Sequence, residues 1–236
     1  MTMPQIGSRA ELFAAFRDQI NREAARHDAQ IRILSNLDDF AQVERGGESR
    51  IFDPARQSGL PLCLLVMQAN EVVATWACSV FDTGNETMAD FLRHSNFYRD
   101  DGKDGWIFSG AALELAEEMR GIIAYCGGLW VREDHRGNKG GTLGPWWTGT
   151  AGLLGRCIAA EMWDPDWFWL ISDFGKVADK CAPRYSLKQI ANEVDWLVDG
   201  QSFDGLKVLG VQDRSHLIQS VQDRLVPSHQ LSAARL

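Results

Sequence analysis

The residues best suited to chemistry lie between Gly128 and Thr142, where an apolar run leads into a basic, glycine-rich turn and then into a second apolar segment. Three glycines among positions 137 to 141 allow the backbone to adopt φ > 0 and to point several N–H groups at one anion. Arg136 and Lys139 place full positive charges beside those groups. The pattern favours a diphosphate-binding turn, and the alternative is an ordinary loop between a strand and a helix.

A strand before this turn and a helix after it must position it. The apolar run Ile122–Val131 predicts the strand, in which Gly127 and Gly128 mark either a bulge or a place where a ligand lies against the backbone. Thr142 caps the predicted helix, which extends to about Met162. Because the N-terminus of a helix carries partial positive charge, the helix adds to the same anion site.

The predicted helix contains a glycine repeat. Gly149, Gly152 and Gly155 recur every three residues, and each costs about 1 kcal/mol relative to alanine inside a helix. We therefore expect another part of the molecule to approach this face of the helix closely.

The remaining elements alternate between strands and helices. Ser8 and Glu11 form a capping box for an amphipathic helix that reaches about Ala25. Leu62–Met67 and Val72–Phe81 predict a β-hairpin of two buried strands. Other strands are predicted at Ile31–Leu34, Trp167–Ser172, Val194–Val198 and Lys207–Val211, and other helices at Ser35–Val43, Glu86–Arg93, Ser109–Met119, Lys176–Pro183 and Ser215–Leu225.

Composition excludes several classes of function. The 236 residues carry a formal net charge of −8, which disfavours a nucleic-acid partner. Apolar runs such as Leu60–Met67 fall short of the roughly 20 residues that a membrane helix needs, and Met1–Ala10 contains no apolar signal core, so we expect a cytoplasmic protein. The five cysteines are odd in number and widely spaced, as expected of reduced, buried thiols. No Cys-x-x-Cys or His-Glu-x-x-His motif predicts a metal site.

The segment Val131-Arg-Glu-Asp-His-Arg-Gly-Asn-Lys-Gly-Gly141 resembles the signature of the GNAT superfamily of N-acyltransferases. In that signature a strand ends in valine, and an acidic turn is followed by Arg or Gln, two variable positions, Gly, one variable position, and Gly or Ala. Arg136 and Gly141 occupy the first and last positions. Lys139 stands where the family usually has glycine, and Gly140 falls one place late.

The resemblance covers about Ile31–Val211 and implies an α+β fold with a mixed sheet, the GNAT-like acyl-CoA N-acyltransferase fold. It divides the chain into an N-terminal helical extension over 1–30, the GNAT-like domain over 31–211, and a C-terminal helix and tail over 212–236.

By the same resemblance, an acyl-CoA, acetyl-CoA by default, enters where the strand ending Leu129–Val131 separates from Trp167–Ser172. Backbone groups near Val131 bind the pantetheine arm. The diphosphate is taken by Arg136, Gly137, Asn138, Lys139, Gly140, Gly141 and Thr142. Tyr185 is the candidate that protonates the departing thiolate, and the alternative is a structural tyrosine with its ring in the core.

The sequence names no general base. Glu133 and Asp134 lie near the turn, where solvated side chains are the simpler interpretation. Three functions remain open: an acyl-CoA-dependent N-acyltransferase acting on a small-molecule or peptide amine, a non-catalytic protein on the same scaffold that acts through ligand binding or interaction, for instance as a homodimer, and a signal-molecule synthase.

Overall fold

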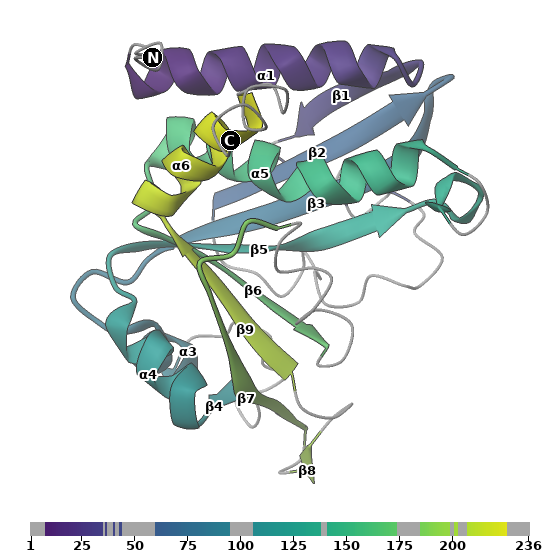
Figure 1. The fold of residues 1–236 in the computed structure, drawn as a ribbon. Coiled ribbons are helices and arrows are strands. Elements are labelled where there is room, and N and C mark those ends of the chain that lie inside the picture. Colours follow the sequence, from purple (N-terminus) through teal and green to yellow (C-terminus); the bar gives the residue numbers. More distant parts are fainter. Residues whose placement is uncertain are drawn as a thin grey trace, which may run out of the picture.

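The computed structural model describes residues 8–34, 36, 40, 43, 60–94, 106–137, 141–173, 185–198, 201–202 and 207–225. Within these ranges a mixed sheet carries helices on both faces (Figure 1). Its strands are β1 (Ala29–Leu34), β2 (Leu60–Gln68), β3 (Glu71–Asp82), β4 (Trp106–Phe108), β5 (Ile122–Val131), β6 (Trp167–Asp173), β7 (Gln189–Val198), β8 (Gln201–Ser202) and β9 (Lys207–Asp213). The helices are α1 (Arg9–Ala25), α3 (Met88–His94), α4 (Gly110–Glu118), α5 (Leu143–Trp163) and α6 (Arg214–Leu225). The predicted α+β fold with a mixed sheet is confirmed.

The sheet runs in the order β1-β2-β3-β5-β6-β9-β7-β4, and β8 pairs with β7. β5 and β6 are parallel, whereas the other paired strands are antiparallel. Helix α5 connects the two parallel strands and lies on the same face of the sheet as α1 and α6 (Figure 1). This crossover places the N-terminus of α5 beside the end of β5. Helices α3 and α4 pack against the opposite face of the sheet.

Two apolar clusters hold the layers together. The first contains residues of α1, α5 and α6 together with side chains from β2, β3 and β5, and Phe16 and Trp147 are among its fully buried members. The second joins α3 and α4 to side chains from β3, β5, β6 and β9, and Tyr125 and Trp169 belong to it. Alternate residues of β5 thus contribute to opposite faces, as the pleat of a strand requires.

Local sequence signals explain where several elements begin and turn. The backbone N–H of Ser8 donates to the Glu11 carboxylate at 2.7 Å, which confirms the capping signal for α1. The β2–β3 hairpin turns at Ala69 and Asn70, both with positive φ (48° and 67°), as a two-residue type I′ turn requires.

Asp213, the last residue of β9, caps the N-terminus of α6. Its carboxylate accepts a hydrogen bond from the His216 backbone N–H at 2.8 Å and another from Lys188 Nζ. Burial alone would raise the pKa of Asp213, but these hydrogen bonds outweigh that effect and hold the pKa below its usual value of 3.8. The ionised carboxylate therefore stabilises the folded chain.

Some predictions need correction or lie outside the described residues. β7 begins at Gln189 rather than Val194, and β4 and β8 were not predicted because three- and two-residue strands give no periodic signal. The helix predicted at Lys176–Pro183 and most of that at Ser35–Val43 lie outside the described residues.

The described cysteines, Cys63, Cys78, Cys126 and Cys157, are free and buried, as expected, while Cys181 lies outside the described residues. Among the helices that the structure describes, none has the length and apolar character to cross a membrane.

Candidate functional site

A bulge in β5 shapes the site. Ala77 of β3 pairs with Gly127 and Thr75 pairs with Trp130, so two residues of β5 lie opposite the single residue Trp76. Gly128 has φ = +60°, and the Thr75 hydroxyl donates to the Gly128 carbonyl at 2.7 Å. Of the two interpretations that the sequence allowed for the glycine pair, the structure shows the bulge. A bulge bends its strand and increases its local twist.

The bent strand separates from its parallel neighbour, and Figure 1 shows β5 and β6 diverging from a common end. The two strands pair at three positions only, and Tyr125↔Trp169 is the last of them. Beyond it β5 continues to Val131 while paired with β3, and β6 continues to Asp173 while paired with β9. Among the described residues, the facing edges of β5 and β6 therefore have no strand partner over this length, and such an edge accepts an added extended chain.

The glycine-rich turn folds back tightly on the start of α5. The Gly141 N–H donates to the Arg136 carbonyl at 3.1 Å. A Cβ on Gly141 would lie 2.3 Å from the His135 carbonyl oxygen, and one on Gly144 would lie 2.5 Å from the same atom. Glycine at both positions is therefore required for this backbone approach.

Helix α5 begins at Leu143, and the N–H groups of Leu143 and Gly144 have no acceptor within the helix. Pro145 has no N–H, and the Trp146 N–H donates to the Thr142 carbonyl at 3.3 Å. Thr142 takes the N-cap position as predicted, but its side chain makes no capping hydrogen bond. Its hydroxyl lies 3.4 Å from His27 Nδ1. Asn138, Lys139 and Gly140 lie outside the described residues.

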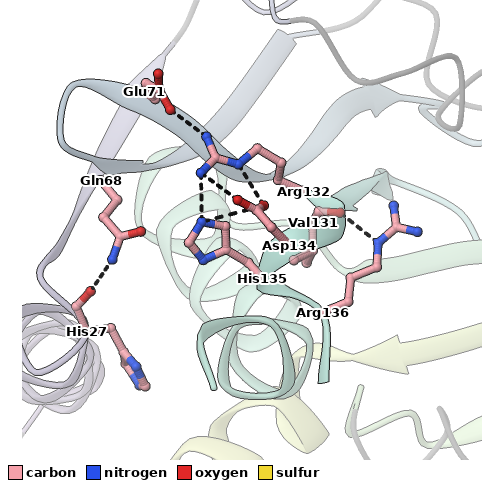
Figure 2. A network of polar contacts seen from close by, with 8 residues as sticks. All are labelled: His27, Gln68, Glu71, Val131, Arg132, Asp134, His135 and Arg136. Atoms are coloured by element: carbon pink, nitrogen blue, oxygen red, sulfur yellow. Dashed lines mark hydrogen bonds and ion pairs between the residues drawn. The ribbon is translucent and has the colours of Figure 1, made fainter. Parts of the chain in front are cut away.

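An ion-pair network holds the residues before this turn (Figure 2). Arg132 donates to Asp134 at 2.8 Å and to Glu71, at the start of β3, at 2.6 Å. The hydrogen bond from Arg132 is the main reason that the pKa of Asp134 is lowered. Asp134 thus has a structural role at the surface. Figure 2 also shows Arg136 directed away from this network, with its Nε donating to the Val131 carbonyl at 2.9 Å.

Two cavities lie along β5 and α5, and both are lined by Leu129. The outer cavity, about 440 Å³, lies at the glycine-rich turn and the start of α5. Its walls are Leu129, Trp130, Val131, Arg136, Gly137, Gly144, Pro145 and Thr148. The inner cavity, about 210 Å³, lies in the split between β5 and β6. Its walls are Trp76, Tyr125, Cys126, Gly127, Gly128, Leu129, Gly152, Arg156, Leu170, Ile171, Ser172 and Tyr185.

One stripe of α5 faces both cavities. Pro145 and Thr148 line the outer cavity, whereas Gly152 and Arg156 line the inner one, and their spacings of three or four residues place them on one side of the helix. Gly149 belongs to the same stripe, and a Cβ added there would meet no atom within 4 Å. The helix surface between the two cavities is therefore open at Gly149, and Leu129 lines both cavities.

The expected close approach to the glycine repeat is confirmed at one end of it. A Cβ on Gly155 would lie 2.0 Å from the Trp76 ring, so the indole packs directly on the helix backbone. At Gly152 the nearest atom is Tyr185 Cδ1 at 3.4 Å, an ordinary contact. At Gly149 nothing approaches.

Arg156 is the residue that the sequence analysis missed. It lies in an otherwise apolar part of α5 and is 2% exposed. Its Nε donates to the Gly152 carbonyl at 2.8 Å, and its Nη2 donates to the Tyr185 carbonyl. Burial lowers the pKa of the Arg156 guanidinium. The signal available in the sequence was a single arginine within a run of small and apolar residues in the predicted helix.

Tyr185 and Cys126 complete the inner cavity. Tyr185 lies in a turn before β7. Cys126 is 6% exposed, and burial raises the pKa of its thiol to about 12, although the Arg156 charge acts in the opposite direction. Cys126 is therefore a neutral thiol at physiological pH.

The sequence matches no known family profile and no curated protein. Among solved structures, it is similar to Arabidopsis thaliana NAA60 in complex with acetyl-CoA (13% identity, TM-score 0.44, 79% of this chain and 99% of that one). It is also similar to Escherichia coli ElaA (14%, 0.39, 78% and 99%) and to FeeM, an N-acyl amino acid synthase from uncultured soil microbes (14%, 0.37, 96% and 92%). Because their TM-scores lie below 0.5, we base the function on the geometry of the site.

Proposed function

We propose that this chain is an acyl-CoA-dependent N-acyltransferase that uses acetyl-CoA by default and transfers the acyl group directly to a small-molecule or peptide amine. The observation that carries the proposal is the pair of adjacent cavities that share Leu129, one at the N-terminus of α5 and the other between the separated strands β5 and β6. The first suits an anionic group, and the second suits an extended chain that ends in a reactive group.

The separation of the cavities supports coenzyme A in particular. The chain from the β-phosphorus of coenzyme A to its sulfur has about 13 bonds, which span roughly 15 Å at the ~3.5 Å that an extended chain gains per three bonds. Gly144 and Arg156 are twelve residues apart on α5, or roughly 18 Å at ~1.5 Å per residue. Because of the bulge, Val131 and Cys126 of β5 lie opposite Ala74 and Cys78 of β3, which are four residues apart, or roughly 13 Å at ~3.3 Å per residue. A diphosphate in the outer cavity thus places the sulfur in the inner one.

In this proposal the diphosphate binds at the outer cavity, near Arg136, Gly137 and the first amides of α5. Gly141 contributes by allowing the turn to close, because its N–H already has the Arg136 carbonyl as acceptor. The motif resemblance assigns the same role to Thr142 and to residues 138–140, which lie outside the described residues. The pantetheine arm lies along the free edge of β5 toward Val131, whose carbonyl is held by the Arg136 side chain.

The reaction then takes place in the inner cavity. The amine nitrogen attacks the thioester carbonyl carbon, the C–S bond breaks, and the thiolate takes up a proton while the amine loses one. The Tyr185 phenol is proposed as the proton donor to the thiolate. Among the described lining residues there is no carboxylate or imidazole, so we assign the proton leaving the amine to water.

A charge placed in the outer cavity tests the proposal. Thr148 is half-buried and lines this cavity, so Thr148→Glu adds a negative charge near the diphosphate, and Thr148→Gln is the matched neutral control. A like charge about 5 Å away costs roughly 1–3 kcal/mol at an effective dielectric constant between 80 and 20, or about 5- to 150-fold in affinity. We expect calorimetry to show this loss for acetyl-CoA with Thr148→Glu and little change with Thr148→Gln. Equal affinities for the two variants would contradict the assignment.

A second candidate is a non-catalytic protein that binds an acyl-CoA in the same cavities. The lack of a carboxylate or imidazole among the described lining residues of the inner cavity favours it. Release of free thiol from acetyl-CoA in the presence of a panel of amines separates the two candidates. Binding without thiol release for any amine would favour the second.

A further inference from the structure

A buried positive charge stands at the inner end of the groove. Arg156 is 2% exposed and lines the inner cavity from α5. A guanidinium carries five N–H donors, and the hydrogen bonds of Arg156 to described residues go to two neutral backbone carbonyls, those of Gly152 and Tyr185. No carboxylate of the described residues forms an ion pair with it.

The neighbouring sulfurs do not supply the missing negative charge. Burial raises the pKa of the Cys126 thiol to about 12, and burial also raises that of Cys157, so both are neutral near pH 7. A buried cation without a negative partner is costly, and an anion that forms charge-assisted hydrogen bonds with it offsets that cost. The cavity beside Arg156 therefore favours an anionic group on whatever molecule enters it.

The other walls describe the rest of that molecule. Around Arg156, the inner cavity is lined by the aromatic residues Trp76, Tyr125 and Tyr185 and the aliphatic residues Leu129, Leu170 and Ile171. Its volume of about 210 Å³ is small. It suits one small molecule with an apolar part, seated next to the end of the pantetheine arm.

We propose that Arg156 binds the carboxylate of the acceptor, so that the acceptor is a free α-amino acid with an apolar side chain. This inference rests on the N-acyltransferase function proposed above. In an α-amino acid the amine and the carboxylate share one carbon, so a carboxylate held by Arg156 keeps the amine at the inner end of the groove, where the thioester lies. A peptide N-terminus has an amide in place of that carboxylate and lacks the matching charge.

Paired acceptors test the inference on the wild-type protein, without any variant. Acetyl transfer is measured as thiol release from acetyl-CoA with L-leucine against L-leucinamide, and with L-phenylalanine against L-phenylalaninamide. Because a hydrogen-bonded buried charge pair strongly favours the matched ligand, we expect kcat/KM for the free acid to exceed that for the amide by about 10- to 100-fold. Equal values for acid and amide, or faster transfer to the amide, would overturn the inference.

Variants show whether Arg156 is the cause. Arg156→Met keeps a long apolar side chain, and we expect the acid-to-amide ratio to fall to about one while transfer to the amide persists. Arg156→Lys, which keeps the charge, should retain part of the preference. If Arg156→Met lowers transfer to acid and amide by the same factor, Arg156 acts on the leaving thiolate or only positions the Tyr185 segment, and the inference is wrong.

The inference and the proposed function fail in different ways. If acetyl-CoA does not bind to the wild type in calorimetry, or no acceptor of either kind releases thiol, the proposed function fails. If acetyl-CoA binds and amides are acetylated as well as free acids, the function stands and only the role of Arg156 is refuted.

Discussion

Two identical substitutions on one helix should have opposite effects on stability. Gly149→Ala and Gly155→Ala each replace a glycine inside α5, and each gains about 1 kcal/mol of helix propensity. At Gly149 the new methyl group meets no atom within 4 Å, so this gain is kept. At Gly155 the same methyl would lie 2.0 Å from the ring of Trp76, which is itself 2% exposed.

The magnitudes follow from these contacts. Forcing a buried indole to move costs about 3 kcal/mol at the upper end of overpacking effects, so the net change at Gly155 is a loss of about 2 kcal/mol. One kcal/mol shifts the melting temperature of a domain of 150–250 residues by about 2–4 °C. We therefore expect Gly149→Ala to melt about 2–4 °C higher than the wild type, and Gly155→Ala about 4–8 °C lower.

Thermal and urea unfolding followed by circular dichroism measure both effects. Combining Gly155→Ala with Trp76→Leu, which removes the ring, should make the two changes clearly non-additive, because the clash disappears with the indole. If both alanine variants shift stability in the same direction, or if the double variant is additive, the packing described for α5 is wrong.

Three further predictions concern other parts of the chain. Asp213→Ala should lower the free energy of unfolding by about 1 kcal/mol at pH 7, as measured by urea titration. Hydrogen bonds that outweigh burial hold the pKa of Asp213 below 3.8, so this loss should shrink as the pH falls below about 4 and the carboxylate is protonated. A loss unchanged at pH 3 would refute this. Thr75→Val should cost about 1–3 kcal/mol because it leaves the buried Gly128 carbonyl without its donor, whereas Thr75→Ser keeps the hydroxyl and should remain near wild type. In a Cys181→Ser background, a thiol reagent at pH 8 should label the protein only after unfolding, as read by mass spectrometry, and rapid labelling of native Cys126 would contradict its burial.

The sequence predicted the elements whose signals are local. The capping box of α1, the buried hairpin β2–β3, the strand β5 and the long helix α5 all follow from short-range patterns of apolar, capping and turn residues. The glycine pair in β5 indicated either a bulge or a ligand against the backbone, and the structure shows a bulge there. These features depend on residues that are neighbours in the chain, which is why sequence alone reveals them.

The parts that the sequence did not predict depend on contacts between distant residues. The role of Gly155 required the position of Trp76, which is 79 residues earlier in the chain. The meaning of Arg156 emerged only when α5 was placed beside Tyr185 and the split strands. Gly141 looked like an amide donor to a ligand, whereas the folded turn uses its N–H internally and needs its missing side chain.

The sheet consists of two blocks, β1-β2-β3-β5 and β6-β9-β7-β4, whose strands are joined at one end by three residue pairs of β5 and β6. Each block has its own ladder of hydrogen bonds, and no strand of the described residues lies between β5 and β6 where they separate. A ligand chain that lies between β5 and β6 would hydrogen-bond to both blocks at a distance from the three residue pairs that join them. It would thereby link two blocks that are otherwise joined mainly by those pairs and by α5. If the proposed cosubstrate binds between β5 and β6, we expect it to hold the two blocks together, so that the bound protein is more rigid than the free one.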